Sequence, residues 1–190
     1  MQSRSRQLAE EYLSGTLRAL RGIDLDTASE IADILLQVRL RKARVFVIGN
    51  GGSASTASHM AVVFSKTSAG LHGSNVDAIA LTDNVAVLTA IANDVEFDRI
   101  FSDQVARVIA AEDVLIAISA SGCSRNIILA AESAKAAGAI VVALTGFGGG
   151  ELVKYADLSI VIDSSEFGPV EDGHLILNHL LTHILRSMDD

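Results

Sequence analysis

Apolar residues follow two periods along this chain, one typical of buried strands and one typical of amphipathic helices. Five short runs rich in Val, Ile, Leu and Ala have the composition of strands that are buried on both faces of a sheet. These runs cover residues 44–48, 77–81, 114–118, 139–144 and 158–162. Because helical segments separate them, the pattern predicts an α/β fold with a doubly wound, five-stranded parallel sheet.

Two amphipathic segments, residues 4–20 and 25–40, precede the first predicted strand. Asp26 or Thr27 is the candidate N-cap of the second segment. We expect one domain, in which residues 1–43 form a helical pair and residues 44–190 an α/β core. The helical pair is a candidate for packing against a partner subunit. Further helices are predicted over residues 53–66, 85–92, 97–109, 125–137, 151–155 and 169–188.

The first predicted strand ends in a glycine-rich loop, Gly49-Asn50-Gly51-Gly52-Ser53, which leads into a helix. Glycines let backbone N–H groups turn toward a ligand, the helix N-terminus adds partial positive charge, and Ser53 adds a hydroxyl. The loop therefore predicts an anion-binding site. An ordinary tight connection between a strand and a helix is the alternative interpretation.

A serine-rich loop follows the third predicted strand and is the more specific phosphate candidate. Ser119, Ser121 and Ser124 place three hydroxyls in a turn that runs into a helix N-terminus. A solvated turn with Ser124 as N-cap is the alternative, but both loops lie at the carboxyl edge of one sheet, where such folds bind ligands. Neither loop matches a Walker P-loop or the dinucleotide fingerprint. We therefore expect a small phosphorylated metabolite and no nucleotide cofactor.

Histidines and carboxylates gather on two of the predicted helices. His59 lies two turns beyond Ser53, where a satisfied core or interface histidine is the alternative to a functional one. The last helix carries Glu171, Asp172, His174, Asn178, His179 and His183 in an otherwise apolar segment. Imidazole titrates near neutral pH, so at least one of these three histidines is a candidate general acid or base. The alternative is that the histidines satisfy hydrogen bonds and the carboxylates complement the helix N-terminus.

Composition limits the classes of binding partner and the cellular compartment that we expect for this chain. The 190 residues carry a net charge of −8 and 4% aromatic residues, so direct nucleic-acid binding is not expected. No apolar run of about 18 residues predicts a membrane span, and charged residues stand where a secretory signal has its apolar core. We therefore expect a cytoplasmic protein. The single cysteine, Cys123, excludes an intramolecular disulfide and a cysteine-based zinc site.

Five motifs, met in order along nearly the whole chain, carry a resemblance to a known family. They are residues 49–54 with His59, residues 90–94, residues 118–124, residues 144–150 and the closing helix with His179. With these motifs the chain resembles the SIS (sugar isomerase) domain family, and within it the phosphoheptose isomerase branch. The resemblance implies a flavodoxin-like sheet and a homotetramer with active sites at subunit interfaces.

The resemblance also implies a reaction and the residues that carry it. The expected activity is aldose–ketose isomerisation through an enediol, with sedoheptulose 7-phosphate converted to a D-glycero-D-manno-heptose 7-phosphate. His179 matches the catalytic histidine of the family, and Glu171 is the best remaining carboxylate. The substrate-binding positions implied are Asn50, Gly51, Gly52, Ser53, Asp94, Ser119, Ser121 and Ser124.

The family pattern further implies zinc, and here the chain departs from it. In the family a histidine and a glutamate one turn apart bind zinc together with a glutamine and the catalytic histidine of the last helix. His59 and His179 match the two histidines, but Val63 replaces the glutamate and Glu171 replaces the glutamine. Ala120 also replaces a threonine. The candidate metal ligands that remain are His59, Glu171 and His179.

Two hypotheses follow from the loss of the glutamate at Val63. In the first, Glu171 takes over as base or metal ligand, and the chain is an isomerase of altered metal dependence. In the second, the fold keeps phosphosugar binding without this chemistry and acts as a regulator or a protein-interaction scaffold. The retained His179 and the gain of Glu171 favour the isomerase.

Overall fold

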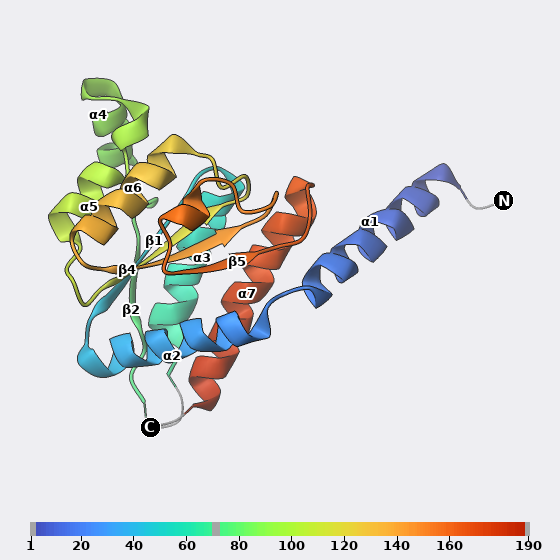
Figure 1. Cartoon of the computed structure of the whole chain (residues 1–190), viewed down its shortest axis with the longest axis horizontal. Helices are drawn as coiled ribbons and strands as arrows, with labels where there is room; N and C mark the ends of the chain where they lie inside the picture. Colours follow the sequence, from blue (N-terminus) through green and yellow to red (C-terminus); the bar gives the residue numbers. More distant parts are fainter. Residues whose placement is uncertain (1–2, 70–72, 189–190) are drawn as a thin grey trace.

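All five predicted strands form, and they pair in parallel in the order β2-β1-β3-β4-β5 in the computed structural model (Figure 1). The strands are β1 (Arg44–Gly49), β2 (Asp77–Ala80), β3 (Val114–Ser119), β4 (Ile140–Thr145) and β5 (Leu158–Val161). The chain leaves β1 toward β2 and returns to β3 on the other side, so the topological switch point lies between β1 and β3. This is where doubly wound sheets bind ligands, and both predicted phosphate loops lie there.

Helices cover both faces of the sheet, as predicted. They are α1 (Arg4–Arg21), α2 (Leu25–Arg41), α3 (Gly52–Thr67), α4 (Val85–Asp94), α5 (Ser102–Val108), α6 (Arg125–Ala136) and α7 (Phe167–Ser187), with short 3₁₀ helices η1 (Phe97–Arg99) and η2 (Leu152–Lys154). Side chains alternate across β1: Val45 and Val47 pack in one hydrophobic cluster with α2, α3 and α7, whereas Phe46 and Ile48 pack in a second cluster with α5 and α6. The described residues are 3–69 and 73–188, so His72 lies outside them.

α1 projects away from the sheet and packs against α7 (Figure 1). Tyr12 Oη donates a hydrogen bond to an Asp172 carboxylate oxygen at 2.9 Å, which ties the middle of α1 to the start of α7. Leu13 and Leu17 of α1 remain 60% and 55% exposed. The helix is therefore amphipathic, as predicted: Ala19 joins the core, whereas Leu13 and Leu17 remain exposed.

Two local predictions were wrong, and a third helix is shorter than predicted. The expected helix over residues 97–109 is broken into η1 and α5, and the break allows the consecutive residues Ile100 and Phe101 both to be buried. The N-cap of α2 is Asp24 and neither Asp26 nor Thr27, because the Asp24 carboxylate accepts from the backbone N–H groups of both. The expected helix over residues 151–155 is only the 3₁₀ turn η2.

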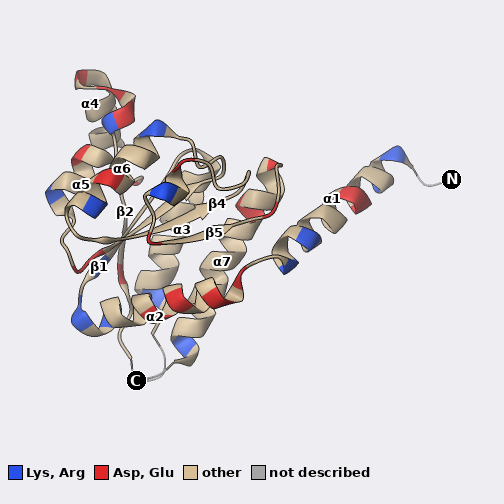
Figure 2. Cartoon of the chain, viewed as in Figure 1, with Lys and Arg blue, Asp and Glu red and all other residues tan. Residues whose placement is uncertain are grey.

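Charged residues are mixed in sign over the helices. Figure 2 shows basic and acidic positions interspersed on α1, α2, α5 and α6. In the part of the chain that the structure describes, no helix is long and apolar enough to cross a membrane.

Candidate functional site

A small pocket of about 150 Å³ opens at the carboxyl ends of β1 and β3. It is lined by Asn50, Ser53, Ile118, Ser119, Ala120, Ser121, Ser124, Phe167 and Glu171. Gly49 permits the tight turn into α3, because a Cβ there would lie 2.4 Å from the Ser53 carbonyl oxygen. The structure thus brings together the four serines that the sequence predicts to hold a phosphate.

Two helices, α3 and α6, begin at this pocket without a side-chain cap. The N-cap of α3 is Gly51, and the Ser124 hydroxyl at the N-cap of α6 makes no capping hydrogen bond. Neither first turn contains an acidic residue. Because the first N–H groups of a helix have no acceptor within the helix, both helix ends offer donors and partial positive charge to a ligand in the pocket.

Two side-chain amides join the loops that form the pocket. The Nδ2 group of Asn50 donates to Asn126 Oδ1, and the Nδ2 group of Asn126 donates to Asn50 Oδ1, each at 2.9 Å. Asn126 is buried and was missed by the sequence analysis. The sequence offers one indication that Asn126 belongs to the pocket: it follows Ser124 by two residues, at the end of the serine-rich loop. The pair holds the start of α3 and the start of α6 in a fixed relation.

Glu171 enters the same pocket from α7 and lies against the first turn of α3. A Cβ at Gly52 would lie 2.5 Å from Glu171 Oε1, so the glycine leaves the space that the carboxylate fills. The pocket lining contains no Lys or Arg. Nor does any described residue donate a hydrogen bond or an ion pair to this carboxylate.

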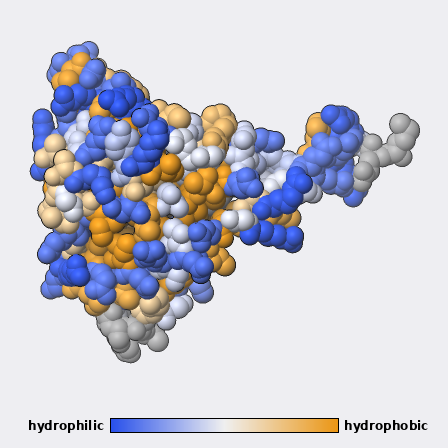
Figure 3. Space-filling view, viewed as in Figure 1, coloured by the Kyte–Doolittle hydropathy of each residue, from blue (hydrophilic) through white to orange (hydrophobic). Residues whose placement is uncertain are grey.

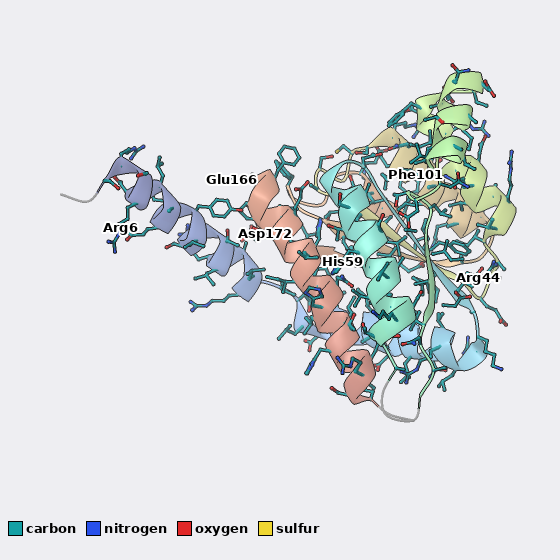
Figure 4. All side chains as sticks on the ribbon, turned by 180° about the vertical axis from the view of Figure 1, so that it is seen from behind. Arg6, Arg44, His59, Phe101, Glu166 and Asp172 are labelled. Carbon is teal, nitrogen blue, oxygen red and sulfur yellow. The ribbon has the colours of Figure 1, made fainter. Side chains whose placement is uncertain are left out.

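Farther along the same two helices, His59 of α3 faces His179 of α7. Their Nε2 atoms are 3.1 Å apart and the two rings are close to perpendicular, at 81°. Figure 4 shows α3 and α7 side by side with His59 between them. Both histidines are exposed to solvent. The structure therefore pairs, within one chain, the two histidines that the family pattern singles out.

These residues do not fit a zinc site within one chain. Val63 offers no ligand one turn after His59, and Glu171 precedes His179 by eight residues, or about 12 Å along the helix axis at about 1.5 Å per residue. Across the described ranges, no three His, Cys, Asp or Glu side chains lie close enough to hold a metal ion. Within one chain, the described residues His59, Glu171 and His179 do not form a three-ligand cluster.

The other polar candidates lie outside the pocket. His174 is fully buried and its Nε2 donates to the Thr145 carbonyl oxygen at 3.2 Å. Burial lowers the pKa of His174 to about 4, so the ring stays neutral near pH 7 and serves the packing of α7 on the sheet. Asp94, predicted to bind substrate, is exposed at the end of α4 and does not line the pocket. His183 is exposed one turn beyond His179.

Comparison with known proteins places this geometry in a family. The SIS domain family matches residues 11–146. A phosphoheptose isomerase from Burkholderia pseudomallei (strain 1710b) is 38% identical over 157 residues, which cover 83% of this chain and 79% of that protein. The chain belongs to the SIS domain family, in its phosphoheptose isomerase branch. A relative of this branch from Sulfurimonas denitrificans is 34% identical over 166 residues, covering 86% of this chain and 83% of that protein.

Solved structures agree with the sequence comparison. The phosphoheptose isomerase from Neisseria gonorrhoeae superposes with a TM-score of 0.89 at 30% identity, and the match covers 98% of this chain and all of that chain, 100%. The structure of the enzyme from Francisella tularensis gives the same TM-score, 0.89, at 28% identity. The family and the five-stranded parallel fold inferred from the motifs are therefore confirmed.

Proposed function

We propose that the chain is an aldose–ketose isomerase that converts sedoheptulose 7-phosphate to D-glycero-D-manno-heptose 7-phosphate. The observation that carries the proposal is the serine pocket, where four hydroxyls meet two uncapped helix N-termini in a chain whose relatives are phosphoheptose isomerases. Hydroxyls and N–H groups of this kind hold a phosphate without a lysine.

The reaction moves protons and leaves the atom count of the sugar unchanged. In the ketose-to-aldose direction a base removes a proton from C1 while the C2 carbonyl oxygen gains one, which gives the enediol. The O1 hydroxyl then loses its proton as the C1 carbonyl forms, and C2 takes up a proton. We assign the acid–base role to His179. His59, whose Nε2 lies 3.1 Å away, is the group that can exchange a proton with it.

The spacing along α3 suits an open-chain sugar. His59 follows Ser53 by six residues, which corresponds to about 9 Å along the helix axis at about 1.5 Å per residue. An open-chain ketose phosphate keeps its carbonyl carbons at the end opposite the phosphate. With the phosphate among the serines, the carbonyl end would therefore extend along α3 toward the two histidines.

We also propose that the chain assembles as a homotetramer whose active sites lie at subunit interfaces. Apolar side chains are exposed on α1 and also on the helices that carry the histidines, where Val62 and Ile176 are 58% and 42% exposed. Figure 3 shows hydrophobic residues gathered on the body next to the base of α1. A second copy covering these surfaces would also screen the histidine pair from water.

Turnover of sedoheptulose 7-phosphate, followed as aldose formation with and without added zinc, tests the assignment. Wild type should isomerise the sugar, whereas His179→Ala should lose turnover and keep phosphosugar binding. His183→Ala, which removes an exposed histidine one turn away, is the matched control and should retain activity. Saturable binding by wild type without turnover would instead favour the second function, a non-catalytic phosphosugar-binding regulator or scaffold, which the absence of a carboxylate at Val63 supports.

A further inference from the structure

The charge of the serine pocket is unusual for a phosphate site, because the one charged residue among its lining residues is an acid. Glu171 lies there with four serines, an asparagine and apolar side chains. A phosphate monoester carries a charge of about −1.5 to −2 near pH 7. An ionised Glu171 therefore repels the group that the serines and the helix ends attract.

The position of the carboxylate confines this repulsion to one part of the pocket, the start of α3. Its oxygens lie against Gly52, in the first turn of α3, where an approaching phosphate oxygen would find the free N–H groups of the helix. Glu171 is half-buried, and in the described part of the chain no cation pairs with it. The sequence of α3, like that of α6, has no acidic residue in its first turn, so Glu171 of α7 brings a carboxylate to the start of α3. Repulsion from an ionised Glu171 is therefore strongest for a phosphate oxygen at the start of α3.

A carboxylate can also stabilise a bound sugar by accepting hydrogen bonds from its hydroxyl groups. When ionised it only accepts hydrogen bonds, so it attracts hydroxyl hydrogens and rejects phosphate oxygens. A sugar phosphate supplies both groups in one molecule. Inorganic phosphate carries the charge that Glu171 repels, and beyond its own P–OH hydrogens it has no hydroxyl groups to donate.

We infer that Glu171 determines ligand selectivity: it disfavours a bare phosphate at the start of α3 and favours phosphate esters whose hydroxyl groups donate to its carboxylate. The inference rests on the proposed function, since it takes the serine pocket as the phosphate site of a sugar phosphate. It gives Glu171 a role in binding, about two turns before His179 on α7.

The test compares two ligands and two matched substitutions. Dissociation constants for inorganic phosphate and for sedoheptulose 7-phosphate are measured by calorimetry on wild type, Glu171→Gln and Glu166→Gln. Glu171→Gln keeps the shape of the side chain and replaces a charge by a donor, so inorganic phosphate should bind about tenfold tighter while the sugar phosphate changes less. Glu166→Gln removes the same charge from an exposed residue outside the pocket and should leave both constants within about twofold.

The possible outcomes separate this inference from the proposed function. If wild type binds both ligands and Glu171→Gln leaves their affinity ratio unchanged, the selectivity role is wrong and the pocket assignment stands. If Glu171→Gln abolishes turnover at an unchanged ratio, Glu171 acts in the chemistry and the inference is overturned. If wild type binds neither ligand, both proposals fail. Glu171→Ala removes the charge without adding a donor and should change the ratio of the two affinities in the same direction. It replaces the glutamine variant in the test if that variant does not fold.

Discussion

Single residues of the pocket can be tested against close neighbours. Ser53 is buried and lines the pocket, whereas Ser55, two residues later on α3, is exposed and lies outside it. A hydrogen bond to a charged group contributes about 1.5–3 kcal/mol, so Ser53→Ala should weaken the binding of sedoheptulose 7-phosphate at least about tenfold. Ser55→Ala should leave it unchanged in the same titration. Equal losses in the two variants would contradict the phosphate site.

His174 gives a prediction about stability and pH. Burial lowers its pKa from 6.5 to about 4. Between these two pH values the imidazole is therefore protonated in the unfolded chain and neutral in the folded chain. The free energy of unfolding should therefore fall as the pH drops from 6.5 toward 4, and this one residue should account for about 2 kcal/mol by pH 5.

Urea denaturation at pH 7 and pH 5 measures that loss. In His174→Gln the amide can still donate to the Thr145 carbonyl but does not titrate, so this variant should lose about 2 kcal/mol less than wild type over the same interval. His183→Gln, at an exposed position, is the control and should follow wild type. The assignment of a neutral buried ring fails if all three proteins show the same pH dependence.

At the scale of secondary-structure elements, the pair Asn50 and Asn126 links the start of α3 to the start of α6. Two hydrogen bonds of 2.9 Å depend on both side chains, so removing either one breaks both bonds. The single variants Asn50→Ala and Asn126→Ala and the double variant should therefore be non-additive, with a coupling of about 1–2 kcal/mol in the free energy of unfolding. Urea denaturation of the four proteins measures this coupling. Additive losses would mean that the amides act independently.

The face shared by α3 and α7 gives a prediction about metal binding. Residue 63 lies one turn after His59 on the same side of α3, so Val63→Glu would add a carboxylate near the two histidines. Zinc affinity, measured by calorimetry, should rise at least about tenfold over wild type, because the variant supplies a third ligand. Val62→Glu adds the same group about 100° around the helix and should not increase it. An equal gain in both variants would rule out a site at the histidine pair.

The elements were easier to predict than the contacts between them. Buried strands and the Gly- and Ser-rich loops at their ends have local signals, so the sheet edge and the four pocket serines could be predicted from residue order alone. The meeting of His59 and His179 depends on which helices lie side by side, and these residues are 120 positions apart. The separation of Glu171 from His179, in contrast, follows from their spacing of eight residues on one helix. Local periodicity also missed the break at Ile100 and Phe101, where burial of consecutive residues overrides a continuous helix.

At the scale of the whole molecule, α1 carries the clearest prediction about assembly. Leu13 and Leu17 are more than half exposed on a helix that projects from the body. The double variant Leu13→Asp/Leu17→Asp should shift the proposed tetramer toward smaller species in light scattering, because burying these charges at an interface is costly. Ser14→Asp places one charge on the polar side of the same helix and should keep the assembly. A tetramer that survives the double variant would place the interface elsewhere.

Because α1 projects from the body, the stability of the protein should also depend on its concentration. If a second copy covers the exposed apolar side chains of α1, association stabilises the folded helix. By mass action, the fraction of chains with α1 folded then increases with protein concentration. The melting temperature should therefore rise with protein concentration, and strong dilution should release α1 before the sheet unfolds. Because Tyr12 holds the start of α7 through Asp172, and Glu171 stands next to Asp172, dilution would also loosen the element that brings the carboxylate into the serine pocket. Ligand selectivity would then depend on the amount of protein present as well as on its sequence.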